Sequence, residues 1–218
     1  MFAAPVEREL EWSDQGVEGS FRFLNRVWRI VYHFKDVLAK KATSYDTAHL
    51  NEADEELRHI LHVSVKKVTE DIDQRFNFNT AISTLMELVN ALYAYREKAE
   101  PVNDGLVYEA ISKLLLMLAP FTPHITEELW HDAMGSETSI HKESWPTYDP
   151  EAIKVEQVEV LIQVNGKPKA RIMAAPEMSK EDLGNLALEQ AEVKAAIGDK
   201  KVMKVIAVPG RLVNIVAK

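Results

Sequence analysis

The 218-residue sequence contains no cysteine. This absence excludes disulfide bonds, thiol nucleophiles and every zinc site that is built on thiolate ligands. Long apolar runs are also missing, since the longest, residues 114–120, is far too short to cross a bilayer. The N-terminus lacks the basic region and apolar stretch of a secretory signal. We therefore expect a cytoplasmic protein without a membrane partner.

Low-complexity segments are absent as well, while 46% of the residues are hydrophobic and 28% are charged. This composition is typical of a folded globular protein, and the length allows two modest domains. The net charge of -8 is unevenly distributed: residues 157–218 carry 10 basic and 7 acidic side chains (+3), and residues 1–156 carry 16 and 27 (-11). Because the overall field repels phosphate, any contact with nucleic acid must depend on local basic patches.

The first two thirds of the chain have the periodicity of amphipathic helices. Five helices are predicted, beginning near residues 14, 51, 77, 104 and 122. Asn51 and Asp54 have the spacing of a capping box, and Thr122 followed by Pro123 is typical of a helix start. The first helix is expected to reach residue 41 with an apolar face of Phe21, Leu24, Trp28 and Val31. These elements predict a helical bundle.

Beyond residue 150 the helical period gives way to an alternating one. Asn165-Gly166 is typical of a tight hairpin turn between two strands. The predicted elements are strands at 158–164, 167–173, 202–208 and 212–216 and a helix at 179–197. The fold class is therefore α+β, a helical bundle followed by a small β-β-α-β-β domain.

Two long motifs, Phe76-Asn-Phe-Asn-Thr-Ala-Ile82 and the stretch 118–130, resemble the anticodon-binding helical domain of class I aminoacyl-tRNA synthetases. They do not separate the leucine, isoleucine and valine branches. The stretches 22–29, 163–167 and 208–216 are similar to the leucyl branch, so the resemblance spans nearly the whole chain. An isoleucyl enzyme would carry a cysteine-ligated zinc near its end and a valyl enzyme a coiled coil, and the sequence contains neither.

The resemblance implies the C-terminal, tRNA-binding portion of a bacterial-type leucyl-tRNA synthetase, an enzyme that joins leucine to its tRNA with ATP and magnesium. The implied partners are leucine tRNA and the catalytic and editing domains, whose motifs this sequence lacks. The chain alone is therefore expected to be inactive, and a monomer. The tRNA-binding portion of the valine or isoleucine enzyme and a protein-interaction module are the alternative functions.

The change from helical to alternating period, with an aperiodic proline-containing stretch between, divides the chain, and the resemblance implies the role of each segment. Residues 1–12 are expected to end a connection from the catalytic domain, 13–147 to form the anticodon-binding-type bundle, 148–156 to be a linker, and 157–218 to form the C-terminal tRNA-binding domain.

Basic residues are the candidates for contact with RNA. One group has i, i+4 and i+7 spacing on the first predicted helix, where it can follow phosphates or pair with acidic residues of neighbouring helices. A second group alternates along one predicted strand of the small domain and is expected to share one face. The full set of candidates is Arg22, Arg26, Arg29, Lys167, Lys169, Arg171, Lys201, Lys204 and Arg211.

No catalytic, cofactor-binding or metal-binding residue is predicted. His59 and His62 are one helical turn apart, but no third metal ligand is suggested nearby, so surface histidines are expected. The sequence around Ser179 imitates the Lys-Met-Ser-Lys loop of the synthetases without its leading lysine. Ser179 with Asp182 has the spacing of a capping box, which predicts a helix start instead.

Overall fold

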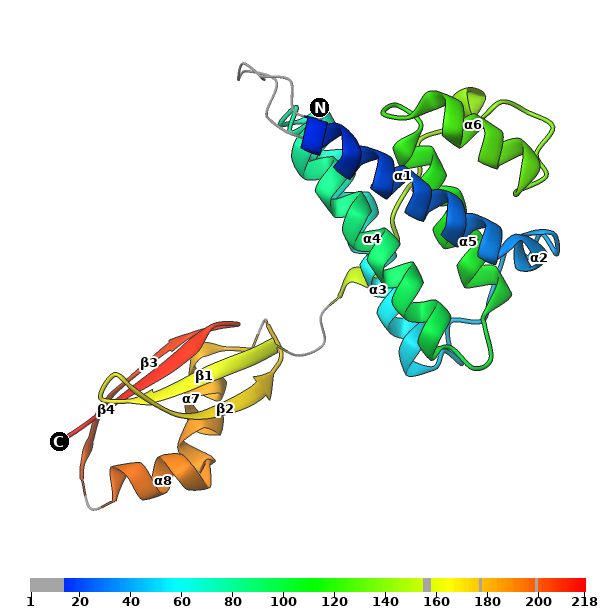
Figure 1. The fold of residues 1–218 in the computed structure, drawn as a ribbon. Helices are drawn as coiled ribbons and strands as arrows, with labels where there is room; N and C mark the ends of the chain where they lie inside the picture. Colours follow the sequence, from blue (N-terminus) through cyan, green and yellow to red (C-terminus); the bar gives the residue numbers. More distant parts are fainter. Residues whose placement is uncertain (1–13, 155–157, 177, 199) are drawn as a thin grey trace. The chain divides into compact units, whose positions relative to one another are not determined.

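The computed structural model describes residues 14–154, 158–176, 178–198 and 200–218 (Figure 1). The segment expected at 1–12 lies outside the described residues. The chain divides into two compact units, Met1–Ile153 and Lys154–Lys218. Each unit has its own hydrophobic core. Among the described helices, none is long and apolar enough to cross a membrane.

The first unit is the predicted helical bundle. Its elements are α1 (Asp14–His33), α2 (Lys35–Leu38), α3 (Glu52–Asp73), α4 (Phe78–Lys98), α5 (Asp104–Leu118), α6 (Pro123–Asp132) and the 3₁₀ turns η1 (Ile140–Lys142) and η2 (Glu151–Ile153). Helices α3 and α4 pack side by side, and α1 packs on α4. Helix α5 is apolar on most of its surface and contacts α2, α3, α4 and α6, which makes it the centre of the core.

The side-chain caps predicted at Asn51 and Thr122 differ in outcome: the first is formed and the second is not. The Asn51 side chain accepts from the Asp54 N–H at 2.9 Å, and the Asp54 carboxylate accepts from the Asn51 N–H at 3.3 Å, which confirms the capping box. Pro123 stands in the first turn of α6. The Thr122 hydroxyl, however, donates back to the Leu118 carbonyl at 3.2 Å and does not cap α6.

The buried face of α1 matches the predicted one in part: Val31 is fully buried, and Leu24 and Trp28 are partly buried against the core. Phe23, Val27 and Ile30 are buried, whereas Phe21 is 65% exposed. Both series have helical spacing, so periodicity alone could not decide which of two adjacent faces meets the core. The helix also ends at His33, where the one-turn helix α2 follows, and does not continue to residue 41.

The second unit is a mixed four-stranded sheet with two helices. Its elements are β1 (Val158–Val164), β2 (Lys167–Ala174), α7 (Lys180–Glu189), α8 (Ala191–Ile197), β3 (Val202–Val208) and β4 (Leu212–Ala217). The strand order is β2-β1-β4-β3, with β1 parallel to β4 and both outer pairs antiparallel. The predicted fold class is confirmed, although the predicted single helix is broken at Gln190, whose ψ of 134° is extended.

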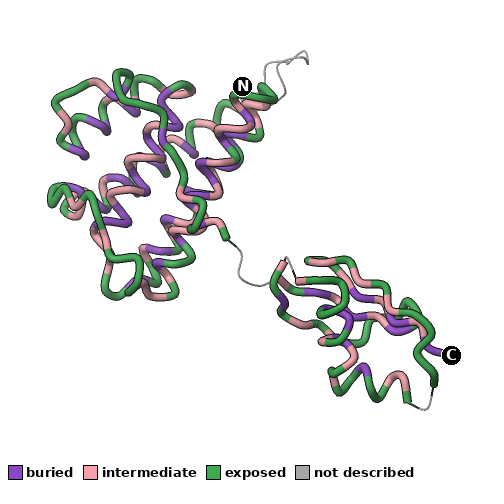
Figure 2. The backbone as a smooth tube through the Cα atoms, turned by 180° about the vertical axis from the view of Figure 1, so that it is seen from behind, coloured by how far each residue is buried: buried purple, intermediate pink, exposed green. Residues whose placement is uncertain are grey.

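One face of this sheet carries the core of the second unit. Burial alternates along β1 and β4 (Figure 2), where Val160, Ile162, Val213 and Ile215 are fully buried. They pack together with Leu183 of α7 and with α8. We call this the covered face. The opposite face, which we call the open face, has no helix from the described part of this unit on it.

After α6 the chain returns along α3. Residues 148–153 fall in the interval expected to be a linker, but η2 packs on α3 and Ala152 is buried. Residues 148–153 of the expected linker therefore pack as part of the bundle. Residues 155–157 lie outside the described residues.

Candidate nucleic-acid interface

The three arginines of the predicted stripe are all exposed on α1. Arg22 pairs with Glu18 of the same helix at 3.1 Å, and Arg26 donates to the side-chain oxygen of Asn90 on α4 at 2.7 Å. Arg29 makes no ion pair with any described residue. Two of the three arginines are thus used in contacts within the bundle, and none of the described contacts pairs an arginine of the stripe with an acid of a neighbouring helix.

Helix α4 adds residues to this surface that the sequence did not reveal. The guanidinium carbons of Arg26 and Arg96 each lie 4.9 Å from the centre of the Tyr93 ring. The Tyr93 hydroxyl donates to the Arg26 carbonyl at 3.1 Å. Two positive charges therefore flank one aromatic ring. The available sequence signal was the one-turn spacing of Tyr93 and Arg96 on α4, but only the tertiary contact places them beside α1.

An apolar strip crosses the open face of the sheet in the second unit. Leu161 of β1 pairs with Leu212 of β4, which in turn pairs with Val208 of β3. Val208 and its strand neighbour Ile206 are 42% and 41% exposed. We call Leu161, Leu212, Ile206 and Val208 the apolar strip.

The basic residues of β2 do not share one face as alternation predicts. A register shift interrupts the pairing of β1 with β2. Lys167 pairs with Val164, which is buried on the covered face, whereas Arg171 pairs with Leu161 of the open face. All three candidates, including Lys169, are nevertheless exposed.

The open face has basic side chains at both edges. Arg171 stands on the edge strand β2, where it pairs with Glu159 at 3.0 Å, and Lys204 stands on the edge strand β3 opposite Val216. The apolar strip lies between them. Among the described residues, no ion pair engages the candidates Lys167, Lys169, Lys201, Lys204 and Arg211, all of which are exposed.

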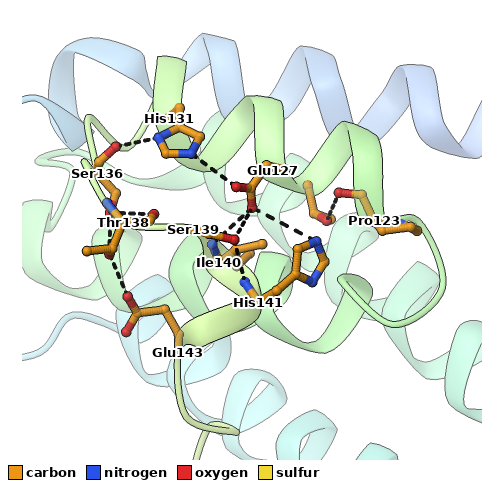
Figure 3. Close-up of polar contacts among 10 residues, drawn as sticks. Pro123, Glu127, His131, Ser136, Thr138, Ser139, Ile140, His141 and Glu143 are labelled. Atoms are coloured by element: carbon orange, nitrogen blue, oxygen red, sulfur yellow. Dashed lines mark hydrogen bonds and ion pairs between the residues drawn. The ribbon is translucent and has the colours of Figure 1, made fainter.

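A polar cluster on the bundle joins α6 to the loop that follows it (Figure 3). The Glu127 carboxylate accepts from the Ser139 hydroxyl at 3.1 Å and the Ile140 N–H at 3.0 Å, and lies 3.1 Å from Nε2 of His131. The other ring nitrogen of His131 is 2.7 Å from the Ser136 carbonyl. Because the serine hydroxyl contacts the carboxylate and not the imidazole, the cluster has no nucleophile–base pair and serves to fix the loop.

The pair His59 and His62 is not a surface pair, which corrects the expectation from the sequence. His62 is only 2% exposed, and its Nδ1 accepts from the Asp149 N–H at 3.0 Å. Burial lowers the pKa of His62 to about 4, so its imidazole is neutral near pH 7. Within the described ranges, no three His, Asp or Glu side chains are grouped to hold a metal ion.

The comparisons with known proteins agree with this architecture. Residues 54–183 match the family model described as "Anticodon-binding domain of tRNA ligase". Since the match covers more than half of the chain, the chain belongs to this family. Its fold is also similar to the LeuRS chain in the crystal structure of the ternary complex of Agrobacterium radiobacter K84 agnB2 LeuRS, tRNA and LeuAMS, with 30% sequence identity and a TM-score of 0.78.

This similarity covers 96% of the chain and 26% of that LeuRS chain. The chain therefore spans about a quarter of the length of the protein that it matches. The resemblance to the leucyl branch is confirmed by these two findings.

Proposed function

We propose that this chain is the tRNA-binding portion of a leucine–tRNA ligase and positions leucine tRNA for chemistry performed elsewhere in the enzyme. Similarity over 96% of the chain to a LeuRS solved with tRNA carries this proposal. The catalytic and editing domains of the same cytoplasmic enzyme are the proposed protein partners. ATP and magnesium serve that catalytic part, so this chain supplies no residue to them.

Within the second unit, the open face of the sheet is the proposed RNA surface. Arg171 and Lys204 at its two edges are placed to contact phosphates, and the apolar strip between them offers a surface for ribose and base. The basic and aromatic residues of α1 and α4 are the second proposed surface. Such contacts recognise the shape of a folded RNA more than its sequence.

A filter-binding assay with leucine tRNA and an unrelated tRNA tests the proposal. The double variant Arg171→Ala/Lys204→Ala should bind leucine tRNA more weakly, and the slope of log affinity against log salt should fall by about 1.5 units for two lost phosphate contacts. The variant Lys180→Ala/Lys194→Ala is a matched control, because it removes two exposed charges that lie on α7 and α8 and not on the strands. It should keep the wild-type slope.

Two results would contradict this assignment. If Arg22→Ala/Arg26→Ala/Arg29→Ala abolishes binding while the Arg171/Lys204 variant binds normally, the bundle is the main RNA surface. If the wild-type chain binds neither tRNA, the tRNA-binding function is wrong and the protein-interaction module is favoured.

A further inference from the structure

The two edges of the sheet in the second unit differ in how well they are protected (Figure 1). The edge strand β2 carries Pro168, which has no N–H, together with three exposed basic residues and a register shift. Proline, charge and irregular register are features that prevent a further strand from pairing with a sheet edge. The β2 edge is therefore protected against strand addition.

The opposite edge strand, β3, lacks this protection over most of its length. Its 7 residues contain no proline and one charged residue, Lys204. Met203, Ile206 and Val208 are 63%, 41% and 42% exposed. The register shift of β3 against β4 lies before Lys204, so the strand is regular from that residue on. On the side away from β4, no described strand pairs with the main-chain groups of β3.

A groove of about 500 Å³ runs between this free edge and helix α7. Its walls include Gly184 and Leu188 of α7 and Val205 of β3. The wall at Gly184 is bare main chain, because a Cβ at this position would stand only 3.1 Å from Cγ1 of Val205. A groove between a helix and an unpaired strand edge has the geometry that binds an extended peptide as an added strand.

Positive charge exceeds negative charge along this groove. Lys180 and Lys204 are both exposed, and neither forms an ion pair with a described residue. Glu181 is the acidic residue of the lining, and it lies in the first turn of α7, where the helix dipole favours a negative charge. Lys180 lies in the same turn, where the dipole disfavours its positive charge. Lys180 therefore does not stabilise its own helix, and an anionic ligand would provide the partner that it lacks.

We propose that this groove binds an extended acidic peptide, which adds to the sheet beside β3. Alternate side chains of such a strand face α7, where Lys180 lies, and the others lie beside Ile206 and Val208 on the open face. The preferred peptide therefore alternates acidic with apolar residues. RNA has no regular series of amide groups to pair with a strand edge, so the free edge favours a peptide over RNA.

Fluorescence anisotropy with the full chain and a labelled peptide of three Glu-Val repeats measures this binding. The variant Lys180→Ala/Lys204→Ala should weaken it about tenfold, the loss expected for two exposed ion pairs. Lys167→Ala/Lys194→Ala is the matched control, because it removes the same charge from exposed positions on β2 and α8 that do not line the groove. It should bind the peptide like the wild-type chain.

Peptides with methylated main-chain nitrogens test the strand pairing itself. In an added strand, the N–H groups of alternate residues face β3 and those of the other residues face away from it. Methylating the nitrogens of all glutamates, or of all valines, removes one of these two sets without changing the charge of the peptide. One of the two methylated peptides should bind at least about tenfold more weakly, and the other should keep the affinity of the parent peptide.

Several results would overturn the proposal. Equal affinities of the two methylated peptides exclude strand addition. Equal weakening by the groove variant and by its matched control means that the peptide follows the general charge of the unit. A peptide with glutamine in place of glutamate that binds as tightly as the parent peptide contradicts the acidic preference.

The same variants separate this proposal from the proposed function. Lys180 is not part of the proposed RNA surface, so Lys180→Ala should weaken peptide binding and leave the affinity for leucine tRNA unchanged. If Lys180→Ala instead weakens tRNA binding and the wild-type chain does not bind the peptide, the groove is a contact for RNA and the peptide proposal is wrong. Loss of tRNA binding in the Arg171→Ala/Lys204→Ala variant neither supports nor contradicts strand addition, which the methylated peptides decide.

Discussion

At the scale of single residues, the burial of His62 makes a definite prediction about pH. Its pKa of about 4 lies below the ordinary value of 6.5, because burial outweighs the attraction of Glu109. Between these two values the unfolded chain takes up a proton that the folded chain excludes, so stability falls as the pH is lowered through this window. From pH 7 to pH 5 the loss is about 2 kcal/mol.

The variant His62→Gln tests this, since glutamine keeps an acceptor for the Asp149 N–H but does not titrate. Urea unfolding at pH 7 and pH 5 should show a loss that is about 2 kcal/mol larger in the wild-type protein than in the variant. Equal losses in the two proteins would mean that His62 is not a buried neutral imidazole.

A second prediction at this scale concerns the two candidate faces of α1. Ile30 is fully buried and Phe21 is 65% exposed. Ile30→Ala should therefore lower the free energy of unfolding by about 2 to 5 kcal/mol, whereas Phe21→Ala should change it by only about 0.5 kcal/mol. Thermal or urea unfolding measures both, and a large loss for Phe21→Ala would restore the face that the sequence predicted.

At the scale of elements, the contact between α6 and the loop at η1 depends on the charge of His131. The Ser136 carbonyl, followed by Glu127, raises the pKa of His131, because both accept from the protonated ring. A raised pKa means that the contribution of this contact is complete below 6.5 and is lost as the pH rises through the pKa in the folded protein.

Titration of the His131 ring protons by nuclear magnetic resonance should show this raised pKa, and Glu127→Gln should lower it. Amide exchange at Ile140, whose N–H donates to Glu127, should accelerate in the same variant. A His131 pKa that does not respond to Glu127→Gln would contradict the contact.

At the scale of the whole molecule, we predict that the chain is chemically silent. Its sequence contains neither the His-x-Gly-His type motif nor the Lys-Met-Ser-Lys motif that the resemblance implies for an adenylate-forming site. Leucine-dependent exchange of pyrophosphate into ATP should not exceed that of a heat-inactivated sample. The full-length Agrobacterium LeuRS is the positive control, and measurable exchange by this chain would refute the prediction.

The sequence by itself determined the features that depend on neighbouring residues. The capping box of Asn51 and Asp54, the Asn165-Gly166 hairpin and the change from helical to alternating period follow from local hydrogen bonding and side-chain direction. The confirmed fold class follows from these signals. The leucyl resemblance also came from contiguous motifs.

Only the tertiary structure decided how distant residues meet. Two adjacent faces of α1 have helical spacing, and only the packing of α1 on the bundle shows that Phe23 is buried and Phe21 is exposed. The register shift separates Lys167 from Arg171, and strand alternation cannot reveal such a shift. His62 is buried because Asp149 lies 87 residues further along the chain and returns to cover it. The burial of a polar side chain such as His62 depends on which distant segment packs on it, and the residues next to it in the sequence do not reveal that segment.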